Sequence, residues 1–199
     1  MEKNNKTSIA SLSNIITCSR IFLAPVFLFV VLSINHLPFD TLTSVYLIWG
    51  IFILIEITDF FDGFVARLLK QESELGRILD PFADSLARLT YFLAFMLLGI
   101  MPVWIFVVVL YRDLWIGFVR LLLSRRGITQ GARMSGKIKA WVYAIAGVFG
   151  ILTISAQYIL NNSEAYDILY FLTQIVFYVV VAAAIWTFFD YTVKLVKKV

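Results

Sequence analysis

The sequence predicts an all-α integral membrane protein with six transmembrane helices and both termini on the cytoplasmic side. Three observations support this prediction. Apolar residues make up 61% of the 199-residue chain, which is more than a soluble domain of this size can bury. Six apolar runs have a length suited to crossing a lipid bilayer. Outside those runs, lysine and arginine are confined to the chain ends and to alternate connections.

The six runs follow one another without an internal repeat or a linker, so we expect a single domain over residues 1–199. They cover residues 15–34, 42–57, 86–100, 103–123, 141–160 and 168–189. Short turns over 35–40, 101–102 and 161–167 alternate with longer polar segments over 59–77 and 124–139. The polar segment 1–13 lacks a signal-peptide cleavage site, so the first run is expected to remain in the protein.

The distribution of charge predicts the orientation. Lysine and arginine occur in residues 1–13, 67–77, 125–139 and 194–198, whereas the three short turns contain none. By the positive-inside rule, both termini and the two long polar segments face the cytoplasm. This topology also explains the net charge of +4, so we expect a lipid bilayer and no nucleic acid as a partner.

Four aspartates interrupt the apolar pattern between the second and third runs. Asp59 and Asp62 are three residues apart and Asp80 and Asp84 are four apart, so each pair shares one face of a helix. Because the chain turns between the pairs, the four carboxylates are expected to meet at the cytoplasmic edge of the membrane. Crowded carboxylates repel one another unless they are neutralised, and Mg²⁺ prefers oxygen ligands. Two such ions would suit a reaction at a phosphoryl centre.

These residues form the pattern D-x2-D-G-x2-A-R-x8-G-x3-D-x3-D, which consists of Asp59, Asp62, Gly63, Ala66, Arg67, Gly76, Asp80 and Asp84. The pattern resembles the signature of the CDP-alcohol phosphatidyltransferase family at every position. The resemblance implies six membrane helices, usually as a homodimer, and a cytidine-nucleotide site that opens to the cytoplasm. It also implies two metal ions, Mg²⁺ or Mn²⁺, bound by the first three aspartates and partly by Asp84, with Asp84 as the general base. The residues implied to contact the CDP-diacylglycerol donor are Thr17, Asp62, Gly63, Ala66, Arg67 and Gly76.

Other positions are similar to the branch of the family whose acceptor is glycerol 3-phosphate. They are Asn14, Thr17, Arg20 and Pro25, then Arg112, Asp113 and Arg120, then S-G-K-I-K-A at 135–140, and finally Asp190 and Tyr191. Within the fourth run, an unpaired Arg112 would be costly, and Asp113 beside it is expected to point about 100° away. A phosphorylated acceptor would need a basic cluster. We expect it to be formed by Arg112, Arg120, Lys137 and Lys139, with Arg112 and Lys137 in a pocket near the aspartates.

Several alternatives remain open at this stage. The same chemistry could use inositol phosphate, serine, choline or a lipid alcohol as its acceptor. A cation transporter would also carry intramembrane acids, although transport sites usually lie near the membrane midplane in repeated halves. The acids could instead form salt bridges with Arg67, Arg77 and Arg88 that only stabilise a helical hairpin. Arg125 and Arg126 are expected to contact anionic headgroups.

Overall fold

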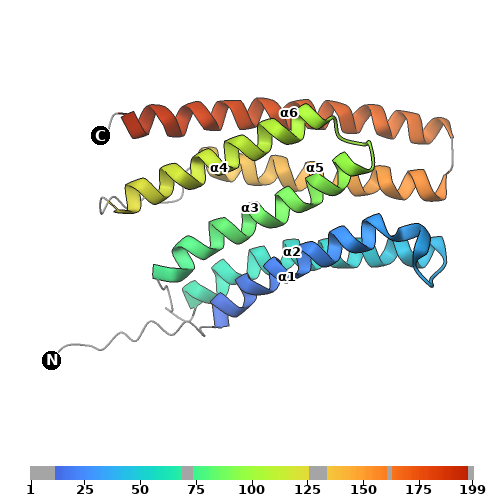
Figure 1. Ribbon diagram of the computed structural model, residues 1–199, viewed down its shortest axis with the longest axis horizontal. Helices are drawn as coiled ribbons and strands as arrows, with labels where there is room; N and C mark the ends of the chain where they lie inside the picture. Colours follow the sequence, from blue (N-terminus) through green and yellow to red (C-terminus); the bar gives the residue numbers. More distant parts are fainter. Residues whose placement is uncertain (1–11, 69–73, 126–133, 161–162, 197–199) are drawn as a thin grey trace.

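A computed structural model describes residues 12–68, 74–125, 134–160 and 163–196, and these ranges form six long helices in one bundle (Figure 1). The helices are α1 (Leu12–Leu32), α2 (Thr41–Leu68), α3 (Glu74–Leu97), α4 (Val103–Arg125), α5 (Met134–Ile159) and α6 (Glu164–Val196). A short 3-10 helix, η1 (Ile34–His36), follows α1. These ranges contain no β-strand, so the prediction of an all-α protein is confirmed.

Four of the described helices, α1, α2, α5 and α6, are long and apolar enough to cross a membrane. The other two, α3 and α4, each carry several charged residues within their length. These include Asp80, Asp84 and Arg88 on α3 and Arg112, Asp113 and Arg120 on α4. The structure therefore supports a membrane protein, while six crossings and cytoplasmic termini remain predictions.

The helices extend beyond the apolar runs into both long polar segments. The sequence predicts an end at residue 57, whereas α2 continues to Leu68. Likewise α3 begins at Glu74 instead of residue 86, and α5 begins at Met134 instead of residue 141. Hydrogen bonding within a helix does not depend on hydropathy, so an apolar run marks only the part suited to lipid. As a result, all four signature aspartates lie on helices and not in loops.

Local sequence signals define the start of α2 and the end of α3. Asp40 caps α2, because its carboxylate accepts a hydrogen bond from the Thr43 amide at 3.2 Å. Gly99, with φ of 73°, ends α3. Its amide donates to the Met96 carbonyl at 3.0 Å and the Ile100 amide donates to the Phe95 carbonyl at 2.9 Å. This pair of bonds is a Schellman motif, which reverses the chain toward α4.

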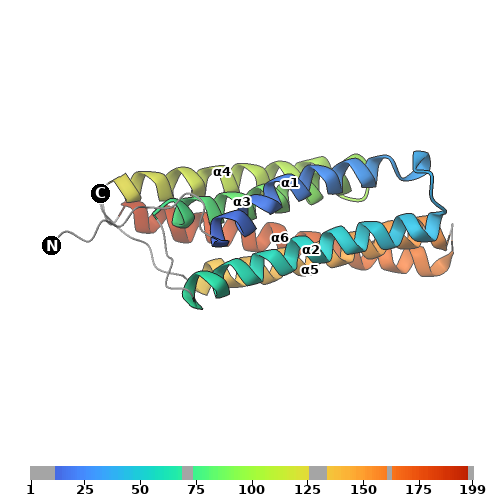
Figure 2. The same ribbon diagram turned by 90° about the horizontal axis from the view of Figure 1, so that it is seen from below.

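An aromatic core joins α2, α3 and α5. The ring of Tyr91 packs edge-on against Phe52 and also contacts Phe95. Two glycines of α5 make room for these rings, since a Cβ atom would lie 2.9 Å from Phe52 at Gly147 and 2.3 Å from Phe95 at Gly150. Figure 2 shows α1, α3 and α4 along one side of the bundle and α2 and α5 along the other. The start of α1, the end of α6 and the polar ends of the other helices lie at the same end of the bundle (Figure 1).

Candidate active site

Asp59, a residue of α2, forms ion pairs with two buried arginines. Arg20 of α1 forms an ion pair with Oδ1 of Asp59. Arg88 of α3 places Nη2 3.2 Å from Oδ2 of Asp59 and 2.8 Å from Oδ1 of Asp84. The arginine side chains are only 1% and 5% exposed, whereas Asp59 is 34% and Asp84 27% exposed. The guanidinium groups therefore lie behind the carboxylates, which remain accessible.

Asp80 joins this cluster through α1, because the Thr17 hydroxyl donates to its Oδ1 at 2.8 Å. Three of the four signature aspartates are thus held by partners from α1 and α3. Gly76 is buried near the start of α3. The remaining signature residues, Asp62, Gly63, Ala66 and Arg67, lie on the last turns of α2, and their side chains are outside the described part of the structure.

The aspartates suit a hard divalent cation. Among the described side chains, no group of three acids, histidines or cysteines is close enough to hold a metal alone. Asp59, Asp80 and Asp84 nevertheless offer only carboxylate oxygens, the donors that Mg²⁺ and Mn²⁺ prefer. Among the described side chains, these three carboxylates outnumber the two arginines that contact them, so this part of the cluster retains negative charge.

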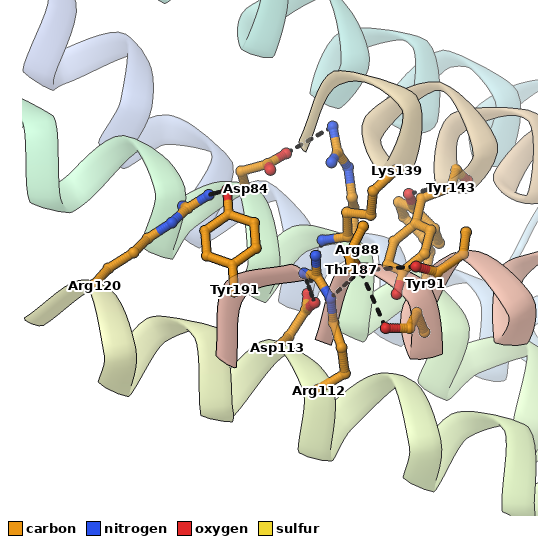
Figure 3. Close-up of polar contacts among 12 residues, drawn as sticks. Asp84, Arg88, Tyr91, Arg112, Asp113, Arg120, Lys139, Tyr143, Thr187 and Tyr191 are labelled. Atoms are coloured by element: carbon orange, nitrogen blue, oxygen red, sulfur yellow. Dashed lines mark hydrogen bonds and ion pairs between the residues drawn. The ribbon is translucent and has the colours of Figure 1, made fainter. Parts of the chain in front are cut away.

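A second cluster, which we call the basic cluster, consists of Arg112 and Asp113 on α4 and Lys139 on α5 (Figure 3). Arg112 donates through Nε to Thr187 at 2.9 Å and places Nη1 2.7 Å from Oδ1 of Asp113. Lys139 Nζ lies 3.0 Å from Oδ2 of the same carboxylate and 4.2 Å from the centre of the Tyr143 ring. The expectation that Asp113 points away from Arg112 is not met, because the long arginine side chain folds back to it. Two buried cations sharing one carboxylate leave positive charge that an anion can neutralise.

The other two predicted acceptor residues lie elsewhere. Arg120 donates to the Tyr191 hydroxyl at 3.2 Å and sits 5.6 Å from the centre of that ring. The Lys137 side chain is exposed. Because Lys137 and Lys139 are two residues apart, they point about 200° apart around α5. The structure therefore places Lys139, and not Lys137, beside Arg112.

The basic cluster adjoins the aspartates. Figure 3 shows Arg88 between Asp84 on one side and Lys139 with Arg112 on the other. The charges of both Arg88 and Asp84 act on Lys139. Carboxylates of the kind that bind metals and cations of the kind that bind phosphate are thus side by side, a combination suited to chemistry between two phosphorylated substrates.

Three residues of this arrangement, Arg20, Arg88 and Thr187, were not predicted from the sequence as site residues. Arg20 and Arg88 each stand alone as a cation in or beside an apolar run, and this isolation is a signal for an internal ion pair. Thr187 lies in an apolar run without any such signal, and only the structure shows its contact with Arg112.

The sequence model of the CDP-alcohol phosphatidyltransferase family matches residues 10–189, a range that includes both clusters. The chain belongs to that family. The resemblance inferred from the aspartate pattern is therefore confirmed, and the protein is a transferase of this family.

Curated relatives support the same assignment. A Treponema pallidum protein named CDP-diacylglycerol–glycerol-3-phosphate 3-phosphatidyltransferase is 35% identical over 143 residues, which cover 71% of this chain but only 66% of that protein. A Bacillus subtilis protein of the same name is 33% identical over 146 residues, covering 68% of this chain and 74% of its own length. An Aquifex aeolicus protein of that name is 30% identical over 186 residues, or 91% of this chain and 93% of its own length. The similarity to this last protein extends over nearly the whole of both chains.

Proposed function

We propose that this family member transfers the phosphatidyl group of CDP-diacylglycerol to glycerol 3-phosphate, releasing CMP and forming phosphatidylglycerophosphate. The observation that carries this proposal is the position of the basic cluster beside Asp84. A phosphate dianion can take a guanidinium in bidentate fashion and a lysine as a point charge, and so neutralise Arg112 and Lys139. The names of the relatives from T. pallidum, B. subtilis and A. aeolicus support the same donor and acceptor.

Asp59, Asp62 and Asp80, with Asp84 in part, would hold two Mg²⁺ or Mn²⁺ ions. When bound, such ions supply positive charge to the pyrophosphate of the donor and to the departing CMP. Thr17 and Arg20 keep Asp80 and Asp59 in place from α1. The nucleotide would lie along the last turns of α2, where Gly63, Ala66 and Arg67 follow the first aspartate pair.

In the proposed reaction, the acceptor hydroxyl attacks the phosphorus nearest the diacylglycerol. The new phosphorus–oxygen bond forms as the bond to the CMP oxygen breaks, and Asp84 accepts the hydroxyl proton. Arg112 and Lys139 hold the acceptor phosphate, so that the hydroxyl is directed at the donor. Positioning and charge neutralisation supply most of the acceleration in phosphoryl transfer generally.

This site would open to the cytoplasm from a multi-pass protein of the cell membrane. The support is that the end of α2 and the starts of α3 and α5, which border sequence rich in lysine and arginine, lie at one end of the bundle (Figure 1), and that Asp59, Asp84 and Lys139 lie in the adjoining halves of these helices. A homodimer is part of the same proposal and rests on the family resemblance.

The test is CMP release from CDP-diacylglycerol by the purified protein in mixed micelles with Mg²⁺ or Mn²⁺. The acceptor panel is glycerol 3-phosphate, inositol phosphate, serine, choline, glycerol and a lipid alcohol. Preference for glycerol 3-phosphate supports the proposal. Preference for another alcohol would assign a different acceptor to the same transfer reaction. If no acceptor leads to CMP release, the proposed transfer reaction is refuted.

A further inference from the structure

Arg88 uses only part of its hydrogen-bonding capacity. Its Nη2 faces the carboxylates of Asp59 and Asp84. Its Nη1 is buried and has no hydrogen-bond partner among the residues that the structure describes. A buried charged donor without an acceptor is costly, because it has lost water and gained nothing in exchange. The free nitrogen therefore indicates an acceptor atom that arrives from outside the protein.

The surroundings of Arg88 indicate what kind of atom this is. Arg88 lies between the aspartates and the basic cluster (Figure 3), and its charge acts on Lys139 and Tyr143. The Tyr143 hydroxyl is also buried and lacks a hydrogen-bond partner in the described part of the chain. A region that combines unpaired donors with the excess positive charge of Arg112 and Lys139 favours an oxyanion.

We propose that Arg88 binds a phosphate oxygen of a substrate through Nη1 while Nη2 holds Asp59 and Asp84. This inference rests on the proposed function and adds a substrate-binding residue to it. The planar guanidinium group suits this double role, because its nitrogens point in fixed and different directions. The oxygen belongs either to the phosphate of the acceptor or to the pyrophosphate of the donor, since both substrates present the same chemistry at this boundary.

A purely structural counter-ion would need only the contacts of Nη2. Lysine can supply a positive charge to the two carboxylates, but it lacks the second, rigidly placed nitrogen. Arg88→Lys therefore separates the two roles, because it keeps the ion pair and removes the proposed phosphate contact.

The experiment uses the full chain in lipid nanodiscs with Mg²⁺. Calorimetry gives the Kd for CDP and for glycerol 3-phosphate separately, and the thermal unfolding midpoint is measured alongside. Arg88→Lys should weaken one of the two ligands about tenfold or more, with an unchanged midpoint. Weaker glycerol 3-phosphate binding assigns the contact to the acceptor, and weaker CDP binding assigns it to the pyrophosphate. Arg125→Lys, at the exposed end of α4, is the matched control and should leave both affinities unchanged.

The proposal is overturned if Arg88→Lys binds both ligands within about twofold of the wild type. It is also overturned if both affinities fall together with the midpoint, because that result describes a structural counter-ion. Should Arg88→Lys fail to fold, Arg88→Gln, which keeps a nitrogen donor but no charge, is measured instead. Unequal loss of the two affinities then supports the proposal, and equal loss overturns it. A wild-type protein that binds CDP but not glycerol 3-phosphate argues against the proposed acceptor, while the CDP measurement still decides the role of Arg88. A wild type that binds neither ligand refutes both proposals.

Discussion

Substitution of any of the three proposed metal ligands, Asp59, Asp62 and Asp80, is expected to have the same effect on activity. Replacing any one of them by Asn should abolish CMP release, since an amide brings no negative charge to the ion. The same variants should weaken metal-dependent nucleotide binding, which is measured with CDP in the presence and absence of a chelator. Full turnover by the wild type after exhaustive chelation would contradict the metal role of all three.

Substitution of Asp84 should lower turnover without preventing donor binding. Asn can still accept a hydrogen bond from Arg88, but it cannot take the proton of the acceptor hydroxyl. Asp84→Asn should therefore lower kcat by about 10²–10⁴-fold while CDP-diacylglycerol still binds with metal. Turnover and donor binding are both measured, since near-normal turnover would remove Asp84 as the base. Loss of donor binding would instead make it chiefly a metal ligand.

The basic cluster predicts a difference between two lysines of α5. Lys139→Ala should raise the KM for glycerol 3-phosphate tens-fold or more, because a buried charged contact is worth roughly 2–5 kcal/mol. Arg112→Ala should act similarly and Arg112→Lys should remain impaired, since lysine lacks the planar fork. Lys137→Ala should have a much smaller effect, because that side chain is exposed.

Steady-state kinetics with each substrate varied in turn check this prediction, and the donor KM should change little. Uncharged glycerol should be a poor acceptor, because it leaves the cations unpaired. A larger effect at Lys137 than at Lys139, or equal use of glycerol and glycerol 3-phosphate, would show that the basic cluster does not bind the acceptor.

At the scale of the helices, the contact between α5 and α3 depends on Gly150. A Cβ atom there would lie 2.3 Å from the ring of Phe95, which is fully buried and cannot move aside freely. Gly150→Ala should therefore destabilise the protein by roughly 1–3 kcal/mol, as overpacking of a core does. Thermal unfolding in detergent measures the change. Gly50→Ala, where nothing lies within 4 Å of the new Cβ, is the control and should be neutral or slightly stabilising.

The contact between Gly150 and Phe95 also explains why the sequence predicted the pairing of the aspartates but not which lysine of α5 faces inward. The spacing of Asp59 with Asp62 and of Asp80 with Asp84 is local, so it places each pair on one helix face without tertiary information. Lys137 and Lys139 could not be distinguished in this way, because α5 is apolar around most of its circumference and its rotation is not encoded in its periodicity. The rotation follows from packing. Lys139 and Gly150 are eleven residues apart, which is close to three full turns, so the face that packs on Phe95 also turns Lys139 inward.

The apolar runs predicted the number and order of the helices, but they did not predict where α2 ends or where α3 and α5 begin. Hydropathy measures preference for lipid, whereas α2, α3 and α5 continue as helices through polar sequence. Contacts between helices, such as Arg20 with Asp59 and Thr17 with Asp80, depend on which helices are neighbours, and a single sequence does not specify this. The grouping of the aspartates was therefore predictable from their spacing, while the partners that position them were not.

Over the whole molecule, charge is separated along the axis of the bundle. The helix ends that border sequence rich in lysine and arginine lie at one end of the bundle (Figure 1), and the aspartates are in the adjoining parts of α2 and α3. The short turns in the sequence contain neither lysine nor arginine. A soluble phosphorylated acceptor and the released CMP would be exchanged at the charged end. The proposed reaction therefore requires that this end face the cytoplasm, which is also what the positive-inside rule predicts.

Labelling of single cysteines tests this orientation directly. Cys18 is the only cysteine of the chain, so Cys18→Ser provides a background without thiols. Single cysteines are then introduced at exposed positions. His36→Cys and Glu164→Cys are in the short turns, and Lys137→Cys is near the start of α5. A membrane-impermeant maleimide should label the first two in intact cells and the third only after permeabilisation. The reverse pattern would invert the topology and place the aspartates outside the cell. Labelling of His36→Cys and Lys137→Cys from the same side would mean that α2, α3 and α4 do not all cross the membrane, because three crossings must put these positions on opposite sides.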